Sequence, residues 1–219
     1  MTDFNLQAML LMIIPLLLAI TLHEAAHAYA ARHFGDRTAE QMGRLTLNPI
    51  AHIDPVGTII VPLTLFILSN ATGTGLIFGW AKPVPIIPRN FRDVRRGIRM
   101  TSLAGPLSNL LMMCAWGIIV FAASYSNHQF AQAIQNMAMY GMLINAFLGI
   151  FNMIPILPLD GGRVLDSFLP LKLSMQFSKI EPYGTWIIIL LVMATPFFQY
   201  VVYFPAVFMV KSFLMIFGM

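Results

Sequence analysis

Charged side chains are scarce in this chain: they make up only 10% of its 219 residues, against roughly 25% in an average soluble domain. Thirteen basic and nine acidic residues cannot cover the surface of a soluble protein of 24.4 kDa. With 58% hydrophobic residues and a mean hydropathy of +0.76, the composition also excludes a disordered chain. It predicts an integral membrane protein with about five or six spans of roughly 20 residues, in a single domain over 1–219.

Cysteine is almost absent as well. The one cysteine, Cys114, excludes a disulfide framework and a zinc cluster built on thiolates. It lies in an apolar run, so we interpret it as a packing residue. The basic residues are few and grouped in loops, which suits the surface of a lipid bilayer better than a nucleic acid. We therefore expect the bilayer, and no nucleic acid, as the surroundings of this chain.

The hydrophobic segments predict an all-α polytopic membrane protein. Helices that span the membrane are expected in three segments and in the C-terminal stretch: 6–31, 100–125, 133–154 and 182–219. The last of these reads as one span plus a shorter return, with a break near Pro196 or Pro205. Residues 164–181 are expected at the membrane interface. The alternating pattern and turn signal over 43–53 are compatible with a short β-strand.

The placement of the basic residues predicts the topology. Three of them lie in 32–44, six in 82–99 and three in 163–179, whereas 1–31 and 124–136 contain none. Cytoplasmic loops carry the excess of Lys and Arg, so we expect these basic loops inside the cell and the N-terminus outside.

This topology constrains the apolar segment 56–79, because the loops on both sides of it are expected in the cytoplasm. The segment has 24 residues, whereas two full spans need about 40. We therefore favour a re-entrant hairpin over a full span, with its break near Pro62 or within 70–75. Backbone of that kind at membrane depth must be buried in protein or line a cavity.

The end of the first span carries the pattern HExxH, as His23-Glu24-Ala25-Ala26-His27. Positions i and i+4 of a helix share a face, so the two imidazoles can reach one zinc ion, with Glu24 beside them to take a proton from bound water. Met9 precedes His23 by 14 residues, or roughly 21 Å of helix, which places the pair toward the cytoplasmic end of the span. The alternative is a polar cluster at a helix end, with the histidines bonded to neighbouring carbonyls.

A catalytic zinc ion takes three protein ligands, so a third ligand is required. Asp160 is the strongest candidate among the nine acidic residues, because it follows directly after a hydrophobic span. Two prolines before it break the helix, and two glycines after it let the backbone turn. The alternative role for Asp160 is the N-cap of a helix that begins near Gly162.

Three motifs together resemble the site-2 protease family of intramembrane zinc metalloproteases: HEAAH, AGPLSN and NMIPILPLDGGR. The resemblance covers roughly residues 15 to 165, and NPIAHIDPVGT and GWAKPVPI resemble the short prokaryotic branch without PDZ or CBS domains. It implies that one zinc ion per chain is bound by His23, His27 and Asp160. It further implies that Glu24 activates water and that Asn152 supports the substrate or the oxyanion.

The resemblance also implies a function, namely hydrolysis of peptide bonds in or near the transmembrane segments of protein or peptide substrates. The expected location is the inner (plasma) membrane of a prokaryote, with the active site toward the cytoplasm. The alternative function is a membrane metal-binding protein or transporter that uses the same ligands. A transporter needs polar groups along a path through the membrane, and the later segments offer few.

Three other polar residues have weaker signals. His52 and Asp54 match the HIDP pattern of the short branch, which suggests support of the metal ligands. A structural bond at the base of the re-entrant segment is the other interpretation. Asn109, in AGPLSN, is interpreted as a structural residue that bonds across helices.

Overall fold

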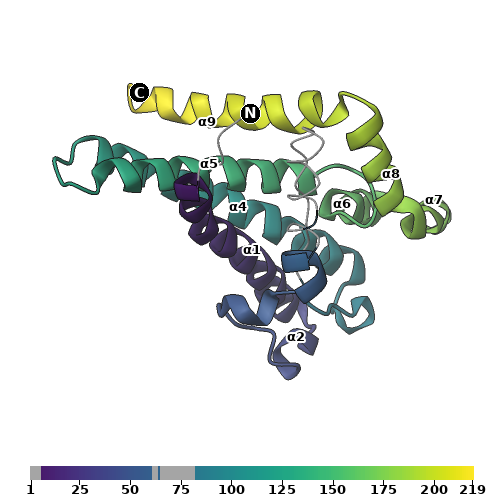
Figure 1. Ribbon diagram of the computed structural model, residues 1–219. Helices are drawn as coiled ribbons and strands as arrows, with labels where there is room; N and C mark the ends of the chain where they lie inside the picture. Colours follow the sequence, from purple (N-terminus) through teal and green to yellow (C-terminus); the bar gives the residue numbers. More distant parts are fainter. Residues whose placement is uncertain (1–5, 61–63, 65–81) are drawn as a thin grey trace.

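The computed structural model describes residues 6–60, 64 and 82–219. Three long helices form the centre of the molecule: α1 (Leu6–Phe34), α4 (Val94–Ser124) and α5 (Ala131–Asn152). A short turn joins α4 to α5, and α1 packs across both of them (Figure 1). The beginning of α4 is fixed by Asp93, whose side chain accepts a hydrogen bond from the backbone N–H of Arg96.

Shorter elements surround these three helices. They are α2 (Thr38–Gln41), η1 (Pro49–His52), η2 (Pro55–Ile60), η3 (Pro88–Asn90), α6 (Asp160–Phe168), α7 (Leu171–Phe177), η4 (Ser178–Ile180), α8 (Glu181–Ala194), η5 (Gln199–Tyr203) and α9 (Phe204–Ile216). Helix α9 lies along α5, while α7 and α8 stand at one end of the molecule (Figure 1).

Small residues allow the long helices to pack closely. A Cβ atom at Gly141 of α5 would lie 2.5 Å from the indole of Trp116 on α4, and one at Gly117 would meet the ring of Phe213 on α9. Close backbone approach of this kind is the usual way in which membrane helices gain packing energy, because lipid offers no hydrophobic drive between them. The apolar core therefore lies between α4, α5 and α9.

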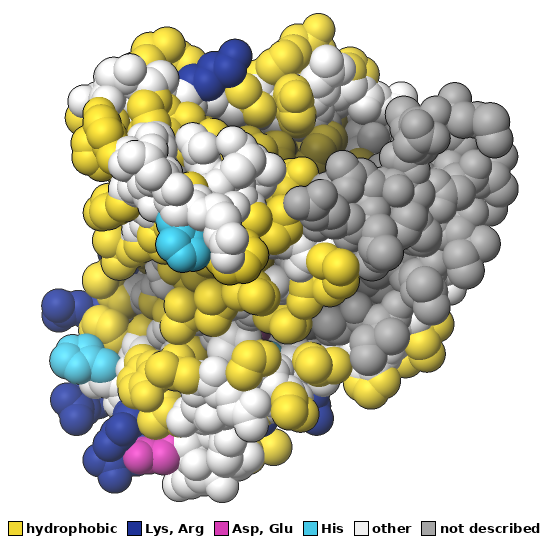
Figure 2. Space-filling model, turned by 60° about the vertical axis from the view of Figure 1, so that its left-hand side comes forward, with side chains coloured by type: hydrophobic (Ala, Val, Ile, Leu, Met, Phe, Trp, Pro, Cys, Tyr) yellow, Lys and Arg dark blue, Asp and Glu magenta, His cyan; other side chains and the backbone are white. Residues whose placement is uncertain are grey.

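The fold confirms an all-α polytopic membrane protein. Five helical stretches among the described residues are long and apolar enough to span a membrane: Leu10–Phe34, Val94–Ser124, Ala131–Asn152, Leu171–Ala194 and Gln199–Ile216. The break expected near Pro196 lies between α8 and η5. Hydrophobic side chains cover most of the described surface in Figure 2, and most of the basic ones gather at the end where α2 lies.

The short strand that the pattern over 43–53 allowed is not formed. Residues 44–48 are an irregular loop, and η1 begins at Pro49. The Asn48 side chain caps η1 by accepting a hydrogen bond from the backbone N–H of Ile50. A strand also requires a partner strand, and the described part of the chain contains none.

The predicted re-entrant segment, 56–79, lies outside the described residues except for 56–60 and Thr64. The loops on either side of it meet in the structure. The side-chain amide of Asn90 donates to Asp36 Oδ1 at 3.0 Å and to the Thr38 hydroxyl at 3.1 Å. The two basic loops therefore lie side by side, and the side of the membrane that they face stays a prediction.

Asp36 joins these two loops from a fully buried position. Its carboxylate accepts hydrogen bonds from the backbone N–H groups of Ile87 and Thr38, from the Thr38 hydroxyl and from the Asn90 amide. Burial by itself would raise the pKa of Asp36, but these hydrogen bonds outweigh it and hold the pKa below its ordinary value. The carboxylate form thus fastens the segment before α4 to the end of α1.

We expect Asp36→Ala to lower the free energy of unfolding at pH 7 by about 1–3 kcal/mol, because buried donors lose their acceptor. Since the folded pKa lies below the unfolded value of about 3.9, the stabilisation is fully present above that pH and is lost as the pH falls through the folded pKa. The difference between wild type and variant should therefore shrink on acidification. Denaturant unfolding in detergent at pH 7 and pH 3 measures both effects.

Glu40→Ala is the control for this comparison, because it removes a partly exposed acidic side chain from the neighbouring helix α2. It should change stability by no more than about 0.5 kcal/mol. Equal stability of Asp36→Ala and wild type at pH 7 would contradict the role of this carboxylate.

Candidate metal centre

Three side chains that the sequence singled out converge in the structure. His23 and His27 lie one turn apart on α1, and Asp160 is the first residue of α6. Each histidine Nε2 atom is 3.3 Å from Asp160 Oδ2, and the two Nε2 atoms are 3.0 Å apart. Ligands bound tetrahedrally at about 2.0–2.1 Å lie about 3.3 Å from one another, so the spacing fits a zinc ion.

The opposite ring nitrogens have acceptors of their own. His23 Nδ1 lies 2.6 Å from Asn109 Oδ1, and His27 Nδ1 lies 2.7 Å from the backbone oxygen of Thr101. Because these oxygens only accept, both Nδ1 atoms carry a hydrogen, and the Nε2 atoms face Asp160. Each imidazole is thus held at Nδ1 by an acceptor on α4, with Nε2 as the nitrogen turned toward the cluster. The bond to a neighbouring carbonyl that the alternative interpretation offered is present at His27, but it leaves Nε2 available.

Helix α4 approaches the histidine pair at a glycine. A Cβ atom at Gly105 would lie 2.5 Å from His27 Nε2 and 2.6 Å from His23 Cε1. The two imidazoles therefore occupy the space that any other residue at position 105 would fill. Gly105 and Asn109 are spaced i and i+4, so they present one face of α4 to the matching face of α1.

Asp160 is placed by the close packing of the turn before it. Helix α6 begins at Asp160, and Leu159 occupies the N-cap position, so the carboxylate is not the helix cap. A Cβ atom at Gly161 would overlap the backbone of Met153, and one at Gly162 would overlap that of Ile156. The two glycines therefore let α6 start directly against the end of α5.

Arg99 attaches α6 to α4. Its guanidinium donates to the hydroxyl of Ser167 at 3.2 Å and to the backbone oxygen of the same residue at 3.4 Å. It also lies over the ring of Phe168, 3.7 Å from the centroid. These contacts fix the helix that carries Asp160 relative to the helix that supports the histidines.

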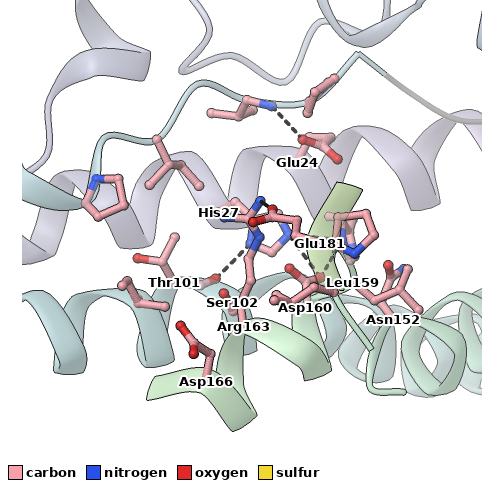
Figure 3. A pocket seen from close by; sticks show the side chains of 18 of the residues that line it. Glu24, His27, Thr101, Ser102, Asn152, Leu159, Asp160, Arg163, Asp166 and Glu181 are labelled. Atoms are coloured by element: carbon pink, nitrogen blue, oxygen red, sulfur yellow. Dashed lines mark hydrogen bonds and ion pairs between the residues drawn. The ribbon is translucent and has the colours of Figure 1, made fainter. Parts of the chain in front are cut away.

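Glu24 lies beside the histidines and faces the segment before α4. Its Oε2 accepts a hydrogen bond from the backbone N–H of Val84 at 2.9 Å (Figure 3). Val84 is buried against Ala28 and Ala39, so this segment is anchored on α1. The hydrogen bond fixes the orientation of a carboxylate that also lines the central cavity.

A cavity of about 490 Å³ contains this site. It is lined by all three converging residues, by Glu24 and by Asn152, together with polar side chains that include Thr101, Ser102, Arg163, Asp166 and Glu181. Asn152 is the last residue of α5, and its amide donates to the backbone oxygen of Leu148 at 2.9 Å. Figure 3 shows Asn152 and Asp160 on neighbouring parts of the cavity wall.

His52 and Asp54 are not among the described residues that line this cavity. His52 is buried, and its Nε2 lies 3.0 Å from the backbone oxygen of Thr46. The side chain of Asp54 accepts hydrogen bonds from the backbone N–H groups of Val56 and Gly57. These contacts agree with the structural interpretation, and support of the metal ligands stays a prediction for both.

Sequence reasoning expected Asn109 to bond across helices but did not predict that Asn109 and Gly105 lie against the histidines. A signal was present, because the spacing in Gly105-Pro-Leu-Ser-Asn109 repeats the i and i+4 spacing of the histidine pair. Spacing alone did not indicate which residues lie on the facing helix.

Comparison with known proteins places this site in a family. The model of Peptidase family M50 matches residues 55–195, a range that contains Asn109, Asn152 and Asp160 and begins after the HEAAH motif. "Putative zinc metalloprotease YwhC" of Bacillus subtilis is 35% identical over 210 residues, which cover 91% of this chain and 87% of that protein. "Putative zinc metalloprotease Rip2" of Mycolicibacterium smegmatis is 26% identical over 86% of this chain and 70% of its own length. No solved structure matches the chain. The chain belongs to Peptidase family M50, the family of the site-2 proteases.

Proposed function

We propose that this chain is an intramembrane zinc metalloprotease, a single membrane domain that hydrolyses peptide bonds in or near transmembrane segments of its substrates. One zinc ion is held by His23, His27 and Asp160. The observation that carries the proposal is the convergence, at 3.0–3.3 Å, of two Nε2 atoms on the apolar helix α1 and one carboxylate oxygen at the start of α6. The names of the relatives support the identity of the metal.

Glu24 is proposed as the general base. Zinc in such a site polarises the scissile carbonyl and lowers the pKa of bound water to about 7. Glu24 follows His23 directly and lines the same cavity, so its carboxylate takes a proton from the attacking water and later delivers it to the leaving amine. The hydrogen bond from Val84 keeps the carboxylate oriented meanwhile.

Asn152 is proposed to stabilise the oxyanion. It lies at the end of α5 and lines the cavity from the side of Asp160. Its amide is bonded within its own helix in the absence of substrate, and it turns toward the developing negative charge when a peptide enters. A hydrogen bond that forms only to the oxyanion stabilises the transition state more than the bound substrate and so speeds the reaction.

Hydrolysis consumes water, which the hydrocarbon core of a membrane excludes, and the cavity provides a polar space through which water can reach the site. Its lining includes the polar side chains of Thr101, Ser102, Arg163 and Glu181, which give water a route to the metal. We place this end of the molecule at the cytoplasmic face of a prokaryotic plasma membrane, because the basic loops 32–44 and 82–99 lie there.

The test of this function combines zinc content with cleavage. The purified full chain in lipid vesicles should contain one zinc ion and cleave single-span membrane peptides, and a chelator should abolish cleavage until zinc is restored. A helical peptide hides its amides in i to i+4 hydrogen bonds, so replacing glycine and proline in the substrate helix with leucine should slow cleavage. Mass spectrometry of the products locates the cut. Zinc-loaded protein that cleaves no member of such a panel would refute the proposal.

A further inference from the structure

Asn145 lies behind Asn109, one layer further from the proposed metal ligands. Both side chains are fully buried, where α4 and α5 pack together. Asn109 Nδ2 donates to Asn145 Oδ1 at 2.9 Å, and Asn145 Nδ2 donates to the backbone oxygen of Gly141 at 2.8 Å. The two amides and His23 thus form one continuous chain of hydrogen bonds from α5 to α1.

This series of hydrogen bonds has one direction of donation, from the His23 side chain at one end, through the Asn109 and Asn145 amides, toward α5 at the other. A backbone oxygen only accepts, so Gly141 requires the NH2 group of Asn145 on its side, which turns Asn145 Oδ1 toward Asn109. Asn145 Oδ1 then requires the NH2 group of Asn109, which turns Asn109 Oδ1 toward His23. Asn109 Oδ1 in turn requires the hydrogen on His23 Nδ1, so Nε2 is the His23 nitrogen that is left to bind a metal. The second acceptor near Asn109 Nδ2, the backbone oxygen of Ala19, is more distant at 3.4 Å.

We propose that Asn145 is a positioning residue of the metal centre, which through Asn109 selects the tautomer of His23 that binds zinc. The inference rests on the ligand set proposed above. Two amides buried between apolar membrane helices are costly unless each is satisfied, and intramembrane polar residues generally mark function. Asn145 acts indirectly. Its Oδ1 accepts from the Asn109 NH2 group and so prevents the Asn109 amide from turning over, which would point that NH2 group at His23.

The experiment measures zinc affinity of the full chain in detergent by competition with a chromophoric chelator. Asn145→Leu keeps a similar volume but removes the acceptor that orients Asn109. The Asn109 NH2 group is then free to turn toward His23, where it opposes the hydrogen on Nδ1. We expect zinc to bind about 10-fold more weakly, at the lower end of the 10–100-fold cost of losing an outer hydrogen-bond partner.

A rescue variant separates orientation from packing. Asn109→Asp in the Asn145→Leu background places an acceptor on both side-chain oxygens, so no orienting partner is needed. Zinc affinity should return to within about 3-fold of wild type. A packing defect at position 145 would not be repaired in this way. Asn136→Leu, an exposed change on the same helix, is the matched control and should bind zinc as wild type does.

The outcomes distinguish this inference from the proposed function. Wild-type affinity in Asn145→Leu would overturn the inference, and so would equally weak binding in the single and double variants. Zinc retained at full affinity in His23→Ala would instead overturn the proposed ligand set. Weak binding in Asn145→Leu with recovery in the double variant supports the positioning role.

Discussion

Replacing Asp160 with alanine is expected to remove most of the zinc from the purified protein. Its Oδ2 lies 3.3 Å from both histidine Nε2 atoms, and loss of it leaves two ligands where a catalytic zinc site needs three. The affinity should fall by more than the roughly 10–100-fold that an outer hydrogen-bond partner contributes. Metal analysis after dialysis against a weak chelator provides the measurement.

Asp166→Ala is the matched control, because Asp166 belongs to the same helix and lines the same cavity without joining the three-residue cluster. It should retain one zinc ion per chain. Circular dichroism checks that both variants keep their helices. Full zinc occupancy in Asp160→Ala would show that the third ligand is another residue.

Glu24→Gln should retain zinc and lose proteolysis. Glutamine keeps the shape of the side chain and an oxygen that accepts the hydrogen bond of Val84, so the site stays assembled. It cannot take up a proton at neutral pH, and general base catalysis contributes typically about 10²–10⁴-fold to rate. We expect cleavage of a transmembrane peptide to fall by that factor at unchanged zinc content.

Glu181→Gln is the control for this variant, since Glu181 lines the same cavity but is paired with Arg163 at 3.4 Å. It should cleave within a few-fold of wild type. Normal cleavage by Glu24→Gln would eliminate Glu24 as the base. The alternative function, metal binding or transport through the same ligands, predicts that Glu24→Gln leaves the activity of the protein intact.

The parts of this site that were predictable follow from local spacing. His23 and His27 share a helix face because they are four residues apart, whatever the rest of the chain does. Asp160 was found because acidic residues are so few and because its prolines and glycines break a hydrophobic span. Long apolar runs predicted most of the membrane helices and the break near Pro196 for the same reason, since each signal lies within one segment. The candidate span Leu171–Ala194 differs, because it begins within 164–181, which was expected at the membrane interface.

The parts that were missed depend on contacts between segments. Asn109 supports His23 across 86 positions of sequence, and Asp36 joins Ile87 across 51, so no local pattern announces either bond. Asn109 was expected to bond across helices, and it does, but the sequence did not identify His23 and Asn145 as its partners. The strand over 43–53 was an error of another kind, because alternation does not reveal whether a partner strand exists.

The distance along the sequence between the converging residues has a thermodynamic consequence if they bind zinc as proposed. His27 and Asp160 are 133 positions apart, on the first long helix and on a short helix near the far end of the core. An ion held by both fastens α6 to α1 much as a covalent crosslink would, and ligand binding to the folded state alone adds RT ln(1 + [L]/Kd) to its stability. The metal would then stabilise the tertiary structure in addition to its role in catalysis. Scarcity of zinc in the cell would control not only how fast this protein works but how long it survives folded.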